Sequence, residues 1–151
     1  MYKTFADLRA KRARGDNGFT LIELLVVVVI LGVLIAIAIP VYLNYRKGAN
    51  DSAAESDVRN AISVLEVCNA GVGTYPVQAT AGALAATPCT GQSITTSSGT
   101  TLSYVSNAGG TAYVVGGSNT GGAPKYWCYN SAKGGAVTSI TAPTMLALTS
   151  C

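Results

Sequence analysis

The sequence contains no histidine, and this absence removes several kinds of active site at once. Catalytic triads and histidine-ligated metal centres both need the imidazole ring. Aspartate and glutamate are missing after Glu66, which excludes paired-carboxylate catalysis and a carboxylate-rich calcium site from the rest of the chain. No Gly-Lys-Ser or Gly-Lys-Thr follows any glycine-rich stretch, so a phosphate-binding loop is absent too. We therefore predict that the protein is not an enzyme and uses no metal or cofactor.

Charge is scarce, and it is unevenly placed along the 151 residues. Residues 1–18 hold five basic and two acidic side chains, whereas the remainder holds five of each. The positive-inside bias predicts that the basic end stays in the cytoplasm and that the rest crosses the membrane. The remainder has no cluster of cations that would neutralise phosphates, so it gives no strong signal of a nucleic-acid partner.

One long apolar run dominates the N-terminal part of the chain. From Leu24 to Ile39 there is no charged or strongly polar side chain. Counted from Phe19, the run has 21 residues, which as a helix would be roughly 30 Å long, the thickness of a bilayer's hydrocarbon core. The one acid near its start, Glu23, would cost roughly 2.5–3.5 kcal/mol at the bilayer centre if it stayed unpaired. The run therefore predicts a membrane helix in which something neutralises Glu23.

A partner for Glu23 would appear if the chain were cut between Gly18 and Phe19. The new α-amino group would lie one helical turn from Glu23, on the same face. These three residues and the apolar run ending at Pro40 resemble the prepilin signal of type IV pilins and the related pseudopilins, over about residues 15–40. The resemblance implies cleavage after Gly18 and N-methylation of Phe19 by a membrane prepilin peptidase. It also implies that the helix is buried in a filament core, where Glu23 pairs with the amino terminus of a neighbouring subunit.

Two simpler interpretations explain less of the sequence. A secretory signal has an apolar region of about 7–15 residues, and its cleavage site follows that region; here the run is longer and the candidate site precedes it. An ordinary single-pass anchor explains the length but neither the Gly18-Phe19 pair nor Glu23. The pilin-like interpretation is therefore favoured.

The chain is predicted to have an α+β fold in four segments. They are a leader (1–18), a transmembrane or filament-core helix (19–40), an amphipathic helix (41–70), and a head made of a loop and an antiparallel sheet (71–151). Pro40 is expected to interrupt and kink the helix because it lacks an N–H donor, and Gly32 weakens it. The resemblance implies that the stretch between these two residues can melt during filament assembly.

The second helical segment has one apolar face, and the head alternates β-rich runs with turns. The face recurs at spacings of three and four residues: Ala54, Val58, Ala61, Leu65 and Cys68. An outward Glu55–Arg59 pair is expected, with Gly71 as the C-terminal cap. The predicted strands are 100–106, 111–115, 125–130 and 136–140, with 93–97 a weaker one. Four residues are expected in the core rather than in a site: Leu102, Tyr104, Val114 and Trp127.

The four cysteines all follow the apolar run, and an even number in a small exported domain favours disulfides. A zinc site is the alternative, but no Cys-x-x-Cys pair is present. Three connectivities are open, and proximity in sequence favours Cys68–Cys89 and Cys128–Cys151. The second pairing would also match the loop that closes the C-terminal part of many pilins, by resemblance alone.

The leading hypothesis is a structural subunit of a type IV pilus. Its implied partners are further copies of itself, the prepilin peptidase, the membrane, and a pilus assembly platform with its ATPase. Its expected location is the inner (cytoplasmic) membrane as a precursor and then the extracellular pilus, with adhesion, motility or DNA uptake as outputs. The alternatives are a pseudopilin of a type II secretion system, and a minor or tip pilin that acts as a binding module.

Overall fold

The computed structural model describes residues 19–140 and Cys151, and the chain divides into two compact units after Val41. Helix α2 (Leu21–Val72) contributes to both units. The predicted interruption of the helix at Pro40 is wrong, because α2 continues through Pro40 without a break. A proline removes one hydrogen bond from the helix, and the intact bonds of the adjacent turns hold the segment together.

The C-terminal cap of helix α2 lies two residues later than predicted. Its last residue is Val72, and Gly73 follows with a φ of 83°, a left-handed conformation that favours glycine. The N–H of Gly73 donates to the carbonyl of Asn69. The capping residue is therefore Gly73 and not Gly71, which lies inside the helix.

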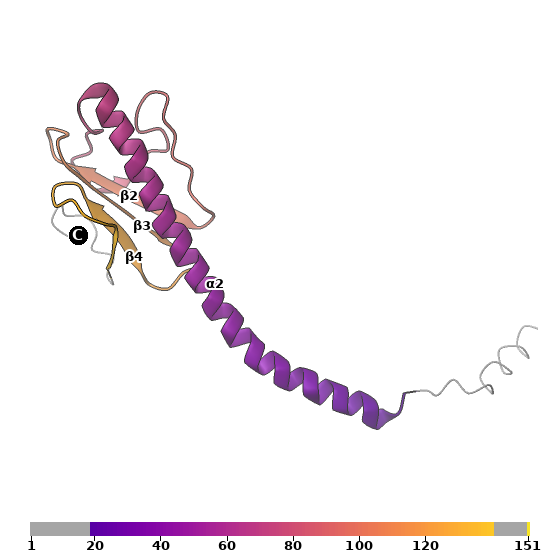
Figure 1. Cartoon of the computed structure of the whole chain (residues 1–151). Coiled ribbons are helices and arrows are strands. Elements are labelled where there is room, and N and C mark those ends of the chain that lie inside the picture. The colour runs from indigo at the N-terminus through magenta and orange to yellow at the C-terminus, as the bar shows by residue number, and fades with distance from the viewer. Residues whose placement is uncertain (1–18, 141–150) are drawn as a thin grey trace, which may run out of the picture. The chain divides into compact units, whose positions relative to one another are not determined.

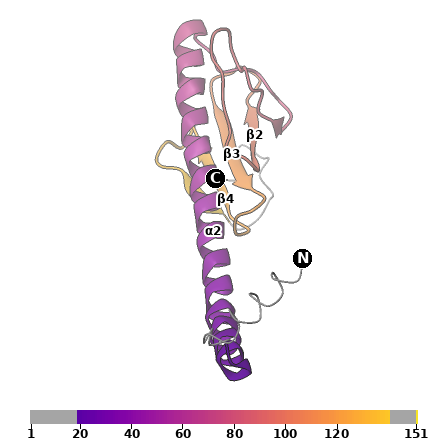
Figure 2. The ribbon, with the colours of Figure 1, turned by 90° about the vertical axis from the view of Figure 1, so that its right-hand side faces the viewer.

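The second unit contains a five-stranded antiparallel sheet whose strands pair in sequence order. The strands are β1 (Gly82–Ala83), β2 (Thr100–Ser106), β3 (Tyr113–Asn119), β4 (Tyr126–Asn130) and β5 (Thr138–Ile140). The C-terminal half of α2 lies along one side of this sheet, as two views at right angles show (Figures 1 and 2). This arrangement confirms the predicted α+β class with an antiparallel meander.

The predictions for residues 93–97 and for the loop after α2 are wrong. Residues 93–97 form no strand. The carboxylate of Asp57 on α2 instead accepts hydrogen bonds from the N–H and the hydroxyl of Ser97, at 2.8 and 3.2 Å, and the N–H of Ile94 donates to the carbonyl of Ala86. Strand β1 lies in the stretch predicted as loop, where Gly82 pairs with Tyr104 of β2.

Strand β3 is longer than predicted because two of its glycines belong to the sheet rather than to a turn. Gly116 and Gly117 pair with Ser103 and Leu102 of β2. A Cβ atom at Gly117 would lie 2.7 Å from Leu102 Cδ2 and 3.2 Å from Val58 Cγ2. Gly117 therefore allows α2 to approach the sheet closely, and a larger residue would push the helix away.

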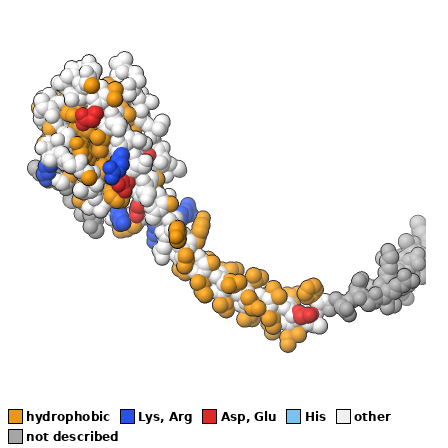
Figure 3. Space-filling view, in the orientation of Figure 1, with side chains coloured by type: hydrophobic (Ala, Val, Ile, Leu, Met, Phe, Trp, Pro, Cys, Tyr) orange, Lys and Arg blue, Asp and Glu red, His pale blue; other side chains and the backbone are white. Residues whose placement is uncertain are grey.

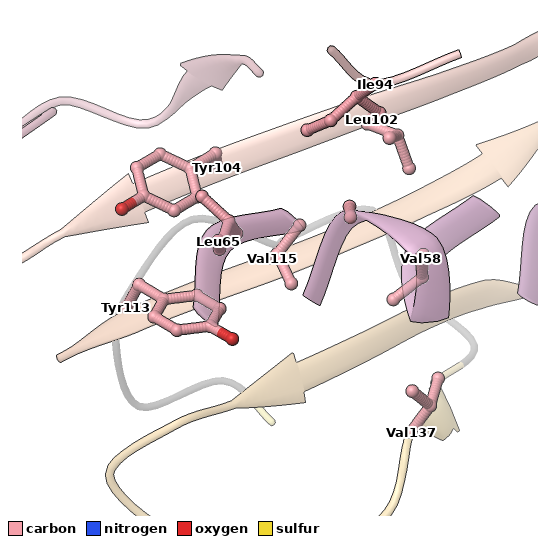
Figure 4. Close-up of a cluster of buried hydrophobic side chains, with 9 residues drawn as sticks. Val58, Leu65, Ile94, Leu102, Tyr104, Tyr113, Val115 and Val137 are labelled. Atoms are coloured by element: carbon pink, nitrogen blue, oxygen red, sulfur yellow. The ribbon is translucent and has the colours of Figure 1, made fainter. Parts of the chain in front are cut away.

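The core lies between α2 and the sheet (Figure 4). The whole predicted face of α2, from Ala54 to Cys68, is buried. Its residues meet side chains from the sheet and the preceding loop: Ile94, Leu102, Tyr104, Tyr113, Val115 and Val137. Trp127 is half-buried and packs against this cluster.

Val114 is buried as predicted, but on the opposite side of the sheet. Side chains alternate along a strand, so Val114 faces away from the helix that its neighbour Val115 contacts. Val105 is paired with Val114 and is also buried. The sheet thus has buried apolar side chains on both faces.

Both disulfides favoured by proximity are present. Cys68 at the end of the buried helical face is joined to Cys89, and Cys128 of β4 is joined to Cys151. The first bond ties the long loop after α2 back to the helix. The second ties residue 151 to the sheet. Residues 141–150 of the predicted head lie outside the described residues.

Candidate assembly site

Helix α2 begins with reciprocal hydrogen bonds between Thr20 and Glu23. The backbone N–H and the hydroxyl of Thr20 both donate to Glu23 Oε2, at 2.8 and 2.7 Å. In return, the backbone N–H of Glu23 donates to the hydroxyl oxygen of Thr20 at 3.3 Å. Such a capping box satisfies backbone donors that the first helical turn leaves without partners. The Thr-x-x-Glu spacing before an apolar run is its sequence signature, which is missed when Glu23 is considered only as a charge.

The cap satisfies the hydrogen bonding of Glu23 but does not cancel its charge. Within residues 19–140, the one ion pair is Arg59–Glu55, at 2.6 Å, so Glu23 faces no cation there. A carboxylate that must enter a water-poor environment still lacks a counter-charge. The positive charge that the expected role of Glu23 requires is therefore not supplied by the described residues of its own chain.

Phe19 lies just before the first residue of α2, on the same side of the chain as Glu23. The two residues line a shallow apolar hollow together with Ile22, Val26 and Val27. Phe19 itself is 82% exposed. The predicted cleavage residue Gly18 and the basic leader lie outside the described residues, so cleavage and methylation remain predictions. The structure does bring the residue that would carry the new amino group onto the same side of the chain as Glu23.

The large apolar side chains of α2 up to Val41 have almost no partners in the chain. From Phe19 to Val41 each is between 49% and 85% exposed, and they form a continuous apolar surface along this part of the helix (Figure 3). The helix is long and apolar enough to cross a membrane. Burying one such side chain fully is worth about 1.5–3 kcal/mol. This surface must therefore be covered by lipid, by other protein chains, or by each in turn.

Gly32 lies in this exposed segment with no neighbour that requires a glycine. No atom lies within 4 Å of the position that a Cβ would take there. Both Gly32 and Pro40 are helical in this structure. Their predicted role in melting the helix during assembly stays a prediction.

The acidic side chains of α2 in the second unit are engaged within the unit. Glu55 pairs with Arg59 as predicted, and Asp57 accepts from Ser97. Glu66 accepts hydrogen bonds from two tyrosine hydroxyls, those of Tyr75 at 2.9 Å and of Tyr113 at 3.0 Å. These contacts join the helix to the loop after it and to β3, so the acids serve the fold of the head.

The tyrosines around Glu66 form an aromatic cluster with perturbed acidity. The ring of Tyr113 lies 4.5 Å from that of Tyr75 and 5.8 Å from that of Tyr104, measured between centroids. Burial raises the pKa of Tyr104 to about 12. Burial and then the charge of Glu66 raise the pKa of Tyr113 as well. All these hydroxyls therefore stay protonated at neutral pH and act as hydrogen-bond donors.

Metal binding finds no support in the described residues, where no three histidine, cysteine, aspartate or glutamate side chains gather as a metal site would require. The cysteines are all in disulfides.

Comparisons with known proteins agree on the N-terminal segment. Residues 13–39 match a family described as the prokaryotic N-terminal methylation motif. The type IV major fimbrial protein FimA of Dichelobacter nodosus is 47% identical over 53 residues, which are 35% of this chain and 34% of that protein. The type IV wide pilus major component of Thermus thermophilus is 43% identical over 54 residues, 36% of this chain and 41% of that protein.

A secretion protein is also similar. The type II secretion system core protein G of Pseudomonas aeruginosa is 36% identical over 63 residues, which are 42% of this chain and 44% of that protein. The chain thus spans less than half the length of each of these relatives. By their names, these relatives are components of type IV fimbriae or pili and of a type II secretion system. In its N-terminal methylation motif the chain is similar to type IV pilins and to a type II secretion core protein, and a long helix and an antiparallel sheet accompany that motif.

Proposed function

We propose that the chain is the structural subunit of a type IV pilus, stored in the membrane and assembled through the N-terminal part of α2. The observation that carries this proposal is the apolar surface from Phe19 to Val41, which no other described part of the chain covers. Lipid covers it in the membrane, and the same parts of neighbouring subunits cover it in the filament. The fimbrial and pilus relatives support this function, as their matched segments are 43–47% identical to this chain.

In this proposal the prepilin peptidase cuts after Gly18 and methylates Phe19, and an assembly platform with its ATPase moves the subunit into the filament. Glu23 then pairs with the amino terminus of Phe19 in a neighbouring subunit. The pair forms only when the incoming subunit reaches the correct depth, so it sets the axial register. Adhesion, motility or DNA uptake follows from the finished fibre.

The first test concerns processing at Gly18. We predict that Gly18→Phe leaves an unprocessed precursor in the membrane, because a bulky side chain occupies the position before the cut. Mass spectrometry of the wild-type protein in sheared surface filaments should show a chain that begins at N-methylated Phe19. A mature protein of normal length from the variant would contradict the proposed cleavage site.

A second candidate function is that of a pseudopilin, which the similarity to core protein G favours. Such a subunit would form a short filament within the cell envelope and serve protein export. The two functions differ in what a deletion strain loses. Loss of surface fibres with normal secretion supports the pilus, whereas loss of secretion with normal fibres supports the pseudopilin.

A further inference from the structure

Directly after the apolar segment, α2 carries two tyrosines and two cations. Tyr42 and Tyr45 are 65% and 79% exposed, and Arg46 and Lys47 are exposed as well. We propose that residues 42–47 are a docking site for the headgroups of anionic phospholipids at the outer face of the membrane. This inference rests on the proposed function, since it requires the preceding segment to span the bilayer.

The two cations have no acidic partner in the described part of the chain. Its one ion pair joins Arg59 to Glu55. Asp51 comes one helical turn after Lys47, but it is only 7% exposed and makes no ion pair with it. A Cβ atom on Gly122 would overlap Asp51 Oδ1, so the backbone of the β3–β4 loop closes over this carboxylate. Arg46 and Lys47 therefore present their charge to the surroundings.

A second copy of this chain offers these cations little to bind. Each other carboxylate in the described residues already accepts hydrogen bonds from its own chain: Glu23 from Thr20, Glu55 from Arg59, Asp57 from Ser97, and Glu66 from Tyr75 and Tyr113. In a neighbouring subunit, Glu55 already pairs with Arg59 and Glu23 is assigned to the amino terminus of Phe19, while Asp57 and Glu66 accept hydrogen bonds within their own unit. Lipid phosphates are not shared with the protein in this way, so they are the favoured anions.

The position along the helix fits the headgroup layer. Arg46 follows Val41 by five residues, which in a helix is a rise of about 7.5 Å. The headgroup region extends about 5–8 Å beyond each side of the hydrocarbon core. Tyrosine is enriched at this boundary because its ring is apolar and its hydroxyl is polar. Long cationic side chains can also bend toward the phosphates.

Such a site would hold the stored subunit at a defined height in the membrane. The basic leader is expected on the cytoplasmic side, and residues 42–47 would hold the opposite end of the membrane segment. Cleavage releases the first anchor. The second would have to be released when the subunit enters the filament, so the lipid composition of the membrane would influence assembly.

The experiment uses the full chain reconstituted into nanodiscs that contain equal amounts of phosphatidylcholine and phosphatidylglycerol. Native mass spectrometry then measures which lipids remain bound to the protein after it is released from the nanodiscs. Each cation near an anionic surface contributes about a fivefold preference, so Arg46→Gln/Lys47→Gln should reduce the preference for phosphatidylglycerol about 25-fold. The matched control, Lys125→Gln/Lys133→Gln, removes the same charge from the head and should retain the preference. The leader contributes equally in all of these chains.

A charge-preserving exchange, Arg46→Lys/Lys47→Arg, should also retain the preference, which separates loss of charge from misfolding. An unchanged preference in the double Gln variant would overturn the inference and leave the membrane anchor intact. An equal loss in the control variant would overturn it too, because the effect would then follow net charge alone. Failure of the wild-type chain to enter the nanodiscs would overturn the membrane anchor itself.

Discussion

Replacing Glu23 by Gln removes the negative charge but keeps a side-chain oxygen that can accept the hydrogen bonds of Thr20. In the structure that oxygen holds both the N–H and the hydroxyl of Thr20, at 2.8 and 2.7 Å. Glutamine serves at this position of a capping box as glutamate does. Glu23→Gln therefore tests the charge alone, whereas Glu23→Ala removes the charge and the cap together.

The charge should matter far more than the cap. Removing one partner of a desolvated ion pair costs about 3–5 kcal/mol, because the other charge stays buried and unpaired. At 1.4 kcal/mol for each factor of ten, incorporation into filaments should fall about a hundredfold or more. Loss of a helix cap costs about 0.5–2 kcal/mol, and it acts only on the first turn of α2. We therefore expect Glu23→Gln and Glu23→Ala to be similarly defective.

Thr20→Ala is the matched control, since it weakens the cap and leaves the charge of Glu23 in place. Membrane fractions should contain all three variants at normal levels, cut after Gly18, while sheared surface filaments are counted and quantified. Thr20→Ala should give filaments in near-normal numbers. Wild-type numbers from Glu23→Gln would refute the register role, and a defect in Thr20→Ala as severe as that of Glu23→Ala would assign the effect to the cap.

The remaining predictions concern the head, studied in the full chain in detergent. Cys89→Ser should lower the free energy of unfolding by about 3 kcal/mol, because it releases a loop of roughly twenty residues; denaturant unfolding with and without reductant measures this, and equal values for the two chains when oxidised would contradict it. Gly117→Ala should destabilise the head by about 1–3 kcal/mol, since the new Cβ would lie 2.7 Å from Leu102 Cδ2. Gly71→Ala, in a helical position with no atom within 4 Å, is its control and should not destabilise. Finally, burial raises the pKa of Tyr104 to about 12, so the unfolded chain releases this proton first, near pH 10. The contribution of Tyr104 to stability should therefore be constant below pH 10 and be lost between pH 10 and 12, and Tyr104→Phe should reduce the fall in stability over that range.

Features that depend on neighbours in sequence were predictable. The length of the apolar run, the apolar face of α2 and the bounds of β2 all follow from the side-chain pattern of a continuous stretch. The N-terminal motif is equally local, which is why it can be identified although the family match covers only residues 13–39. The disulfide pairings also followed proximity, because Cys68 and Cys128 are each bonded to the next cysteine along the chain.

Features that depend on distant contacts were not predictable. In the sequence, Gly116 and Gly117 look like turn residues. In the structure they lie in the sheet, and a Cβ atom at Gly117 would come too close to Val58 of α2 and to Leu102. The pattern of residues 93–97 is typical of a strand, but the backbone N–H of Ser97 donates a hydrogen bond to the carboxylate of Asp57 on α2 instead of to a neighbouring strand. In both cases a contact from about forty or more residues away outweighs the local preference.

The sequence by itself determined that this chain has a long apolar helix that begins within an N-terminal methylation motif, since hydrophobicity and spacing are properties of the chain. Only the tertiary structure decided which charges remain available to partners. The carboxylates of Glu55, Asp57 and Glu66 form hydrogen bonds or an ion pair within the second unit. Arg46 and Lys47 of the same unit have no counter-charge among the described residues. The reason is that an ion pair or hydrogen bond depends on separations of a few ångströms, which folding sets between residues far apart in the chain.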